Sequence, residues 1–123
     1  MIKVLLMEDD PIQIMILEAK MKIEGIFCIV ASNGKEALSL AISEKPDIIL
    51  SDILLGSENG LDIVEKIKKN EKIKDIPIII FTNYADKRAV ARAKELKVTE
   101  YIIKSGVTPK KIIEKIKENI KEN

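Results

Sequence analysis

The sequence contains no histidine and a single cysteine, Cys28. Without histidine the chain cannot build a Ser-His-Asp or Cys-His catalytic group or a histidine-ligated zinc site. One cysteine excludes an internal disulfide and a cluster of thiolates around a metal. Because Cys28 lies in an apolar run, we expect a small buried side chain rather than a reactive thiol. Chemistry must therefore come from carboxylates, hydroxyls, lysine or a hard metal ion.

Arginine is also scarce, with only Arg88 and Arg92 among 21 basic residues, and 20 acidic residues bring the net charge to +1. This balance does not favour nucleic-acid binding as a main function. No apolar run reaches the roughly 18 residues of a membrane helix, and the chain turns acidic at Glu8, too early for a signal peptide. We therefore expect a cytoplasmic protein that contacts neither nucleic acid nor membrane.

Five short apolar runs alternate with longer segments rich in charge. The runs lack polar alternation, as expected for strands buried on both faces of a parallel sheet. They are Val4–Met7, Phe27–Ala31, Ile48–Leu50, Ile78–Phe81 and Tyr101–Ile103. The segments between them predict helices over 11–24, 34–44, 60–70, 85–97 and 109–121. The pattern predicts a single α/β domain over residues 1–123, with a five-stranded parallel sheet covered by helices on both faces.

Capping signals support the predicted helix starts. Asp10 can act as an N-cap residue before Pro11, and Gln13 has the spacing that completes a capping box. Asn33 and Glu36 repeat that spacing at the second helix.

Polar side chains follow four of the five predicted strands. Glu8 and Asp9 come after the first, Asp52 after the third, Thr82 after the fourth and Lys104 after the fifth. Open parallel sheets place their active sites at the carboxyl ends of their strands, at the point where the strand order reverses. We therefore expect these groups to lie near one another.

Three carboxylates in one place require a positive charge. Two like charges ~4 Å apart repel by about 4 kcal/mol at an effective dielectric constant of ~20. An oxygen-only donor set suits Mg²⁺, with Mn²⁺ as a second possibility. Together with the Lys104 ammonium and the Thr82 hydroxyl, the ion would form a cradle for a phosphoryl group, with a carboxylate as its acceptor.

These residues resemble the receiver domain of two-component response regulators over essentially the whole chain. The family has an acidic pair, an acceptor aspartate, a Thr or Ser and a Lys after its first, third, fourth and fifth strands, and the intervals here are similar. Gly60 matches a loop glycine of the family, and Tyr101 matches its switch aromatic residue. The resemblance implies a doubly wound, flavodoxin-like (βα)5 fold with strand order 2-1-3-4-5.

The resemblance also implies a function. Asp52 accepts a phosphoryl group from a phosphohistidine on a histidine kinase or a histidine phosphotransfer protein, and Lys104 pairs with that group. Thr82 moves toward it and Tyr101 turns inward, which changes the face that the last two helices form with the last strand for a downstream protein target. Such a domain catalyses only its own phosphorylation and dephosphorylation, so we do not expect an enzyme with a separate substrate.

For the metal, the resemblance implies a specific ligand set. Asp9 and Asp52 would bind Mg²⁺ directly, Glu8 mainly through water, and the carbonyl of Leu54 would complete the protein's share.

The chain departs from the family at two loop positions. Ser105 follows Lys104 where the family has a proline joined by a cis bond, and a cis bond before another residue costs about 2.5–4 kcal/mol. Gly56 stands where the family often has proline. Leu54 and Tyr84 occupy positions that tune phosphate lifetime in the family; both are large here, and we expect them to hinder attacking water.

The first predicted helix has two apolar stripes on nearly opposite faces. Either stripe can pack on the sheet, which leaves the other for neighbouring elements or for a partner helix. One stripe contains Ile12, Ile16, Ala19 and Ile23, and the other contains Ile14, Leu17 and Met21.

Two other functions remain open from the sequence. A degenerate receiver would keep the fold and act as an interaction module without phosphorylation. A metal-dependent phosphatase would use Asp52 as its nucleophile and would need a substrate pocket, for which short loops leave little room. The sequence does not settle the oligomeric state.

Overall fold

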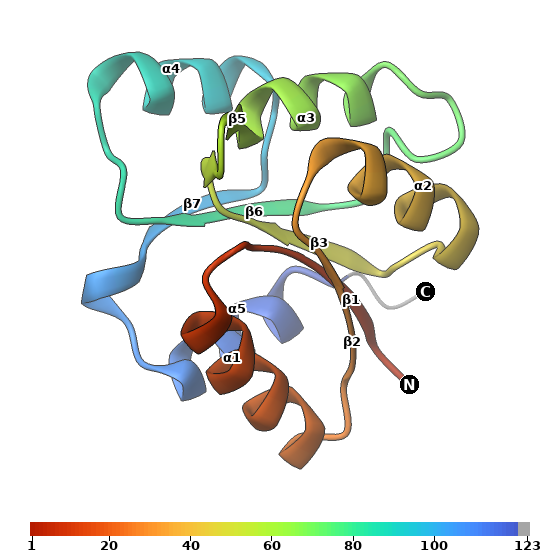
Figure 1. The fold of residues 1–123 in the computed structure, drawn as a ribbon, viewed down its shortest axis with the longest axis vertical. Coiled ribbons are helices and arrows are strands. Elements are labelled where there is room, and N and C mark those ends of the chain that lie inside the picture. Colours follow the sequence, from red (N-terminus) through yellow and green to blue (C-terminus); the bar gives the residue numbers. More distant parts are fainter. Residues whose placement is uncertain (121–123) are drawn as a thin grey trace.

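Five parallel strands form the centre of the computed structural model, which describes residues 1–120 (Figure 1). Their order is β2-β1-β3-β6-β7, which is 2-1-3-4-5 when only these five are counted. This confirms the predicted doubly wound, flavodoxin-like fold. The strands are β1 (Lys3–Met7), β2 (Phe27–Ala31), β3 (Ile48–Ser51), β6 (Ile78–Thr82) and β7 (Glu100–Ile103).

Helices cover both faces of the sheet. Figure 1 shows α1 (Pro11–Ile23) and α5 (Pro109–Glu118) on one face, and α2 (Gly34–Glu44), α3 (Gly60–Lys68) and α4 (Lys87–Glu95) on the other. Within residues 1–120, no helix has the length and apolar character needed to cross a membrane.

The five predicted helices are present, but several are shorter than predicted. The fourth begins at Lys87 rather than 85 because the Asp86 side chain caps it, accepting a hydrogen bond from the Ala89 N–H. The third ends at Lys68 rather than 70, because the chain turns there and the Asn70 side chain accepts from the Lys72 N–H. Residue 121, the predicted end of the last helix, lies outside the described residues.

The N-cap of α1 differs from the prediction in one partner. The Asp10 side chain accepts from the Ile12 N–H, as expected for an N-cap, with Pro11 in the first turn. The Asp10 N–H, however, donates to the carboxylate of Glu8 rather than to Gln13, so the predicted capping box is wrong. Glu8 takes this role because its buried carboxylate lies directly beside the turn.

The sheet separates two apolar cores. β1, β3 and β6 are buried on both faces, apart from the partly exposed Lys3, which explains why their sequences do not alternate. Leu5, Ile49 and Ile80 face the core under α2, α3 and α4, and Leu6 and Leu50 face the core under α1 and α5. Burying each such side chain contributes roughly 1.5–3 kcal/mol, so the central strands are held firmly from both sides.

The structure decides which stripe of α1 faces the sheet. Leu17 and Met21 are fully buried in the core beneath α1. The opposite stripe is exposed, with Ile12 at 65%, Ile16 at 42% and Ile23 at 76%. The exposed stripe begins two residues after the Asp10 cap, so an apolar surface adjoins the carboxyl edge of the sheet.

A short hairpin that the sequence did not predict follows β3. Its strands are β4 (Leu54–Leu55) and β5 (Glu58–Asn59), joined through Gly56, which has a φ of +59°. The Glu58 carboxylate accepts from the Gly34 N–H at 3.0 Å and so ties the hairpin to the start of α2. This loop is therefore fixed at the same edge of the sheet as the predicted site.

Candidate functional site

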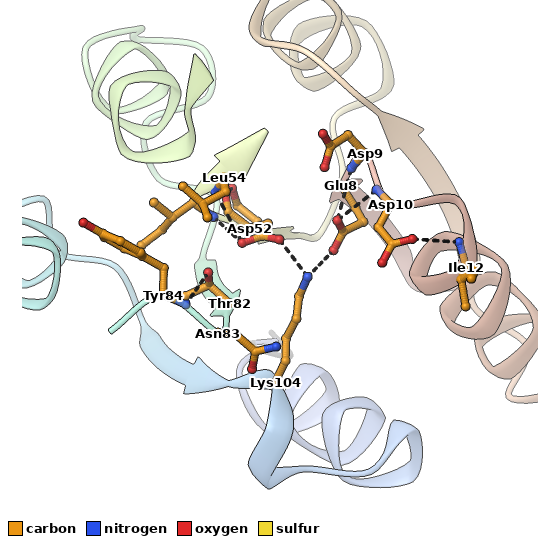
Figure 2. Close-up of polar contacts among 12 residues, drawn as sticks. Glu8, Asp9, Asp10, Ile12, Asp52, Leu54, Thr82, Asn83, Tyr84 and Lys104 are labelled. Atoms are coloured by element: carbon orange, nitrogen blue, oxygen red, sulfur yellow. Dashed lines mark hydrogen bonds and ion pairs between the residues drawn. The ribbon is translucent and has the colours of Figure 1, made fainter. Parts of the chain in front are cut away.

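A lysine and two carboxylates meet at the carboxyl edge of the sheet (Figure 2). Lys104 Nζ lies 2.6 Å from Glu8 Oε1 and 2.7 Å from Asp52 Oδ2. The three residues follow β7, β1 and β3, so the strand order is what brings them together. The side chains are only 14%, 2% and 11% exposed for Lys104, Glu8 and Asp52, so the ion pairs are largely shielded from water.

The protonation of Lys104 reflects two opposing effects. Burial disfavours its charge, but hydrogen bonds and charge attraction from Asp52 and Glu8 outweigh burial and raise the pKa of Lys104 above its ordinary value. The ammonium also lies 5.8 Å from the centre of the Phe81 ring, a cation–π contact. Lys104 therefore stays charged throughout the physiological pH range.

Backbone groups hold the Asp52 carboxylate in place. Its Oδ1 atom accepts from the Ile53 N–H at 2.7 Å, while Oδ2 faces Lys104. The Asp52 N–H in turn donates to the carbonyl of Met7, which extends the pairing of β3 with β1. The carboxylate is therefore oriented by the sheet before any ligand arrives.

Asp9 lies apart from this group. Its exposed side chain points away from Lys104 (Figure 2). Asp9 Oδ2 accepts from the Gly56 N–H at 2.7 Å. In the part of the chain that the structure describes, no three acidic side chains converge closely enough to hold a metal ion. The structure therefore brings Glu8 and Asp52 together as expected, but it turns the Asp9 side chain toward Gly56 of the hairpin.

Thr82 and the two tyrosines form a connected group beside Asp52. The buried Thr82 hydroxyl accepts from the Tyr84 N–H at 3.1 Å, which leaves its own proton able to donate. The Tyr101 hydroxyl donates to the carbonyl of Tyr84. Tyr101 is therefore linked, through the backbone of residue 84, to the Thr82 hydroxyl, which lines the same pocket as Asp52.

A small pocket of about 230 Å³ opens above these groups. The half-exposed Leu54 and Tyr84 side chains contribute to its wall, as their positions in the sequence suggested. Its lining residues are Asp52, Leu54, Thr82, Asn83, Tyr84 and Lys104.

Asn83 has a positioning role that the sequence reasoning missed. Its side-chain oxygen accepts from the Ser105 N–H at 2.9 Å, and the Lys104–Ser105 peptide bond is trans. A proline at position 105 would have no N–H to donate, so this contact depends on the departure from the family pattern. The sequence signals for this contact were a polar residue, Asn83, directly after Thr82 and a residue other than proline after Lys104.

The donor set fits a hard divalent cation in charge and chemistry. Glu8, Asp9 and Asp52 supply oxygen atoms only, and Lys104 neutralises one of their three negative charges. Oxygen donors suit hard cations such as Mg²⁺ or Mn²⁺ better than softer metals. The Asp9 carboxylate would have to turn from Gly56 toward Asp52 to join such a site.

Comparisons with known proteins agree on one family. The model of the response regulator receiver domain matches residues 4–117. The polar-differentiation response regulator DivK of Brucella anthropi is 32% identical over 93% of this chain and 92% of its own length. A CheY-like receiver domain protein from Methanospirillum hungatei superposes with a TM-score of 0.89 at 26% identity, covering 98% of this chain and 94% of that one.

Other similar proteins are longer. The chain is 31% identical to the phosphate regulon transcriptional regulatory protein PhoB of Pseudomonas aeruginosa over 94% of its own length but spans only 50% of PhoB. It spans 44% of a probable transcriptional regulator from Guillardia theta.

Proposed function

Because the chain belongs to the response regulator receiver domain family, we propose that Asp52 accepts a phosphoryl group from a phosphohistidine on a histidine kinase or histidine phosphotransfer protein. One observation carries this proposal: the Asp52 carboxylate, oriented by the Ile53 N–H, lines an open pocket with an ammonium 2.7 Å away. Receiver domains are signalling domains rather than classical enzymes. The family also supports the cytoplasm as the place where such a donor is met.

The transfer needs an acceptor oxygen and a partner for the transferred charge. A carboxylate oxygen of Asp52 forms a bond to phosphorus while the bond from phosphorus to the donor imidazole nitrogen breaks. The nitrogen leaves with the electron pair, and the donor histidine ends as a neutral imidazole when its other ring nitrogen carries a proton. Lys104 then pairs with a phosphoryl oxygen, and the Thr82 hydroxyl donates to another.

The residues that would hold Mg²⁺ are Asp9, Asp52 and the Leu54 carbonyl, with Glu8 acting through water. When bound, the ion neutralises negative charge on the acceptor and on the phosphoryl group. Glu8 and Asp52 share one lysine, so the negative charge that Lys104 does not neutralise attracts the ion.

The contacts around Thr82 support a two-state switch. Movement of the Thr82 hydroxyl toward a phosphoryl oxygen breaks its hydrogen bond with the Tyr84 N–H. Because the Tyr101 hydroxyl is hydrogen-bonded to the Tyr84 carbonyl, a shift of residue 84 also displaces the Tyr101 side chain on β7. The face formed by α4, β7 and α5 then changes for a downstream protein. The exposed apolar stripe of α1, next to the acceptor edge, is the surface we propose for the phosphodonor.

The pocket does not favour the phosphatase alternative. At about 230 Å³ it is smaller than the roughly 300–1,000 Å³ of pockets that enclose an organic ligand. It accommodates a phosphoryl group presented by another protein rather than a substrate held on its own.

Intact-mass measurement after incubation with Mg²⁺ and acetyl phosphate tests the proposal. We expect the wild-type chain to gain one phosphoryl group, the Asp52→Asn variant to gain none, and removal of Mg²⁺ by a chelator to prevent the gain. Asp62→Asn, which changes an exposed acid on α3, is the control and should be labelled like wild type. A wild-type chain that takes up no phosphoryl group would leave an interaction module as the function, and turnover of a phosphoester would support the phosphatase.

We predict that Leu54 and Tyr84 prolong the phosphorylated state. Both line the pocket and restrict the approach of water to Asp52. The Leu54→Asn, Tyr84→Glu double variant should lose its phosphoryl group at least about tenfold faster, a change of ~1.4 kcal/mol in the barrier. The decay of the phosphorylated mass after donor removal measures this. Met15→Asn, which changes an exposed apolar residue of α1 outside the pocket lining, is the control. Equal decay rates in the double variant and wild type would contradict the prediction.

A further inference from the structure

The two outer strands of the sheet, β2 and β7, differ in how they are protected from pairing with another strand. β7 forms one edge and carries Glu100, whose carboxylate pairs with Lys115 and accepts from Asn119 of α5. β2 forms the other edge and reads Phe27-Cys28-Ile29-Val30-Ala31, with no charge, proline or glycine. Proteins often protect a free edge with charged residues or proline, because its unpaired backbone groups otherwise bind another strand.

The backbone of β2 has one bonded side and one free side. The Phe27 N–H donates to the Ile2 carbonyl and the Ala31 carbonyl accepts from the Glu8 N–H, so residues 27, 29 and 31 bond to β1. By alternation, the N–H and C=O groups of Cys28 and Val30 point away from the sheet. Within residues 1–120, β2 is an outer strand of the five-stranded sheet and pairs with β1 alone.

We propose that β2 pairs in antiparallel fashion with β2 of a second copy of this chain, around a two-fold axis at Ile29. In this register Cys28 of each copy lies opposite Val30 of the other, and the two pairs exchange four backbone hydrogen bonds. Phe27, half-exposed in the single chain, lies opposite the small Ala31 of the other copy, so a large side chain meets a small one. Ile29 of one copy lies opposite Ile29 of the other.

The neighbouring helix also fits a second copy. A hollow of about 640 Å³ lies between β2 and α2. Its lining residues are the apolar Ile29, Val30 and Leu40, the polar Asn33 and Ser39, and the charged Lys35 and Glu36. Lys35, Ser39 and Ser43 are exposed at four-residue spacing on one side of α2. A two-fold axis near Ser39 places each Lys35 opposite Ser43 of the other copy, so the two lysines do not face each other and the small serines allow the helices to approach.

The pairing leaves the acceptor sites free. Antiparallel strands point their carboxyl ends in opposite directions, so the two Asp52 sites lie at opposite ends of a joined ten-stranded sheet. Dimer formation through β2 therefore does not require phosphorylation of Asp52, and the two can be tested independently.

Disulfide trapping tests the register. In a Cys28→Ala background, Ile29→Cys places two thiols directly opposite each other, at a Cα separation of ~4.5 Å that suits a disulfide. Phe27→Cys in the same background is the matched control, because its two thiols are four residues out of register. We expect a dimer of the wild-type chain by light scattering and rapid cross-linking of the Ile29→Cys chain only. A monomer at all concentrations, or equal cross-linking of both variants, would overturn the proposal.

Charge variants at the same position provide a second test. Ile29→Lys and Ile29→Glu each place like charges opposite each other and should be monomeric, and their equal mixture should form a dimer again. Circular dichroism of each variant establishes that it is folded. A mixture that stays monomeric while both variants are folded would contradict pairing at Ile29.

Discussion

Alanine at position 60 is expected to lower the free energy of unfolding by about 3 kcal/mol or more. Gly60 begins α3 directly after the hairpin, and its N–H donates to the Ile53 carbonyl at 2.6 Å. A Cβ atom there would overlap the Asp52 carbonyl oxygen and lie 3.1 Å from the Ile53 Cα. Both neighbours are backbone atoms, so the strand end that carries the acceptor must move rather than a flexible side chain.

Urea unfolding of the Gly60→Ala variant measures this loss. Gly106→Ala is the matched control, because nothing lies within 4 Å of the Cβ atom it would add, and its effect should stay within about 0.5 kcal/mol. Phosphorylation of Gly60→Ala should also be slower, since the displaced segment holds the Asp52 carboxylate. Equal stabilities of the two variants would show that the loop relaxes without moving the acceptor.

Replacing Lys104 with methionine is expected to cost about 3–5 kcal/mol of stability at neutral pH without Mg²⁺. The substitution leaves the buried carboxylates of Glu8 and Asp52 without their shared cation. Added Mg²⁺ should stabilise the variant more than wild type, because the ion supplies the missing charge. Lys69→Met, which removes an exposed lysine paired with Glu65, is the control and should change stability by under about 1 kcal/mol.

The pH dependence of this difference follows from the raised pKa of Lys104. A folded-state pKa above the ordinary 10.5 means that the folded chain holds the proton more tightly than the unfolded chain. The stabilisation is therefore fully present below about pH 10.5 and is lost as the pH rises through the folded-state pKa. Unfolding curves of wild type and Lys104→Met should converge in that alkaline range, and a constant difference there would contradict the role of the lysine charge.

The sequence predicted the parts of the site that depend on strand order. Once Ile48–Ser51 is recognised as a strand next to Lys3–Met7, Asp52 must lie beside Glu8, whatever the loops do. Lys104 and Thr82 followed from the same rule, because β6 and β7 continue the sheet on the same side. The five apolar runs lack polar alternation and identified all five strands, although β2 and β7 are only partly buried.

The parts that depend on loop contacts could not be predicted. Nothing in the residues before Gly60 indicates that Leu54 and Leu55 fold back on Glu58 and Asn59, because strands of two residues carry no periodicity. The Asp9 contact with Gly56 exists only in that hairpin, so its direction was not predictable either. Cys28 lies at the free edge and is only partly buried, where an apolar run alone suggested full burial; even so, burial raises the pKa of its thiol to about 12.

The pairing of Glu8 with Lys104 joins residues 96 positions apart, and this has a consequence for how the chain is made. During synthesis, β1, β2 and β3 leave the ribosome long before β7, so the first carboxylates emerge without their lysine. The ion pairs of Lys104 with Glu8 and Asp52 can form only after β7 has left the ribosome and has added to β6. A nascent chain in which β7 has not yet joined the sheet therefore lacks the Lys104 ammonium beside Glu8 and Asp52.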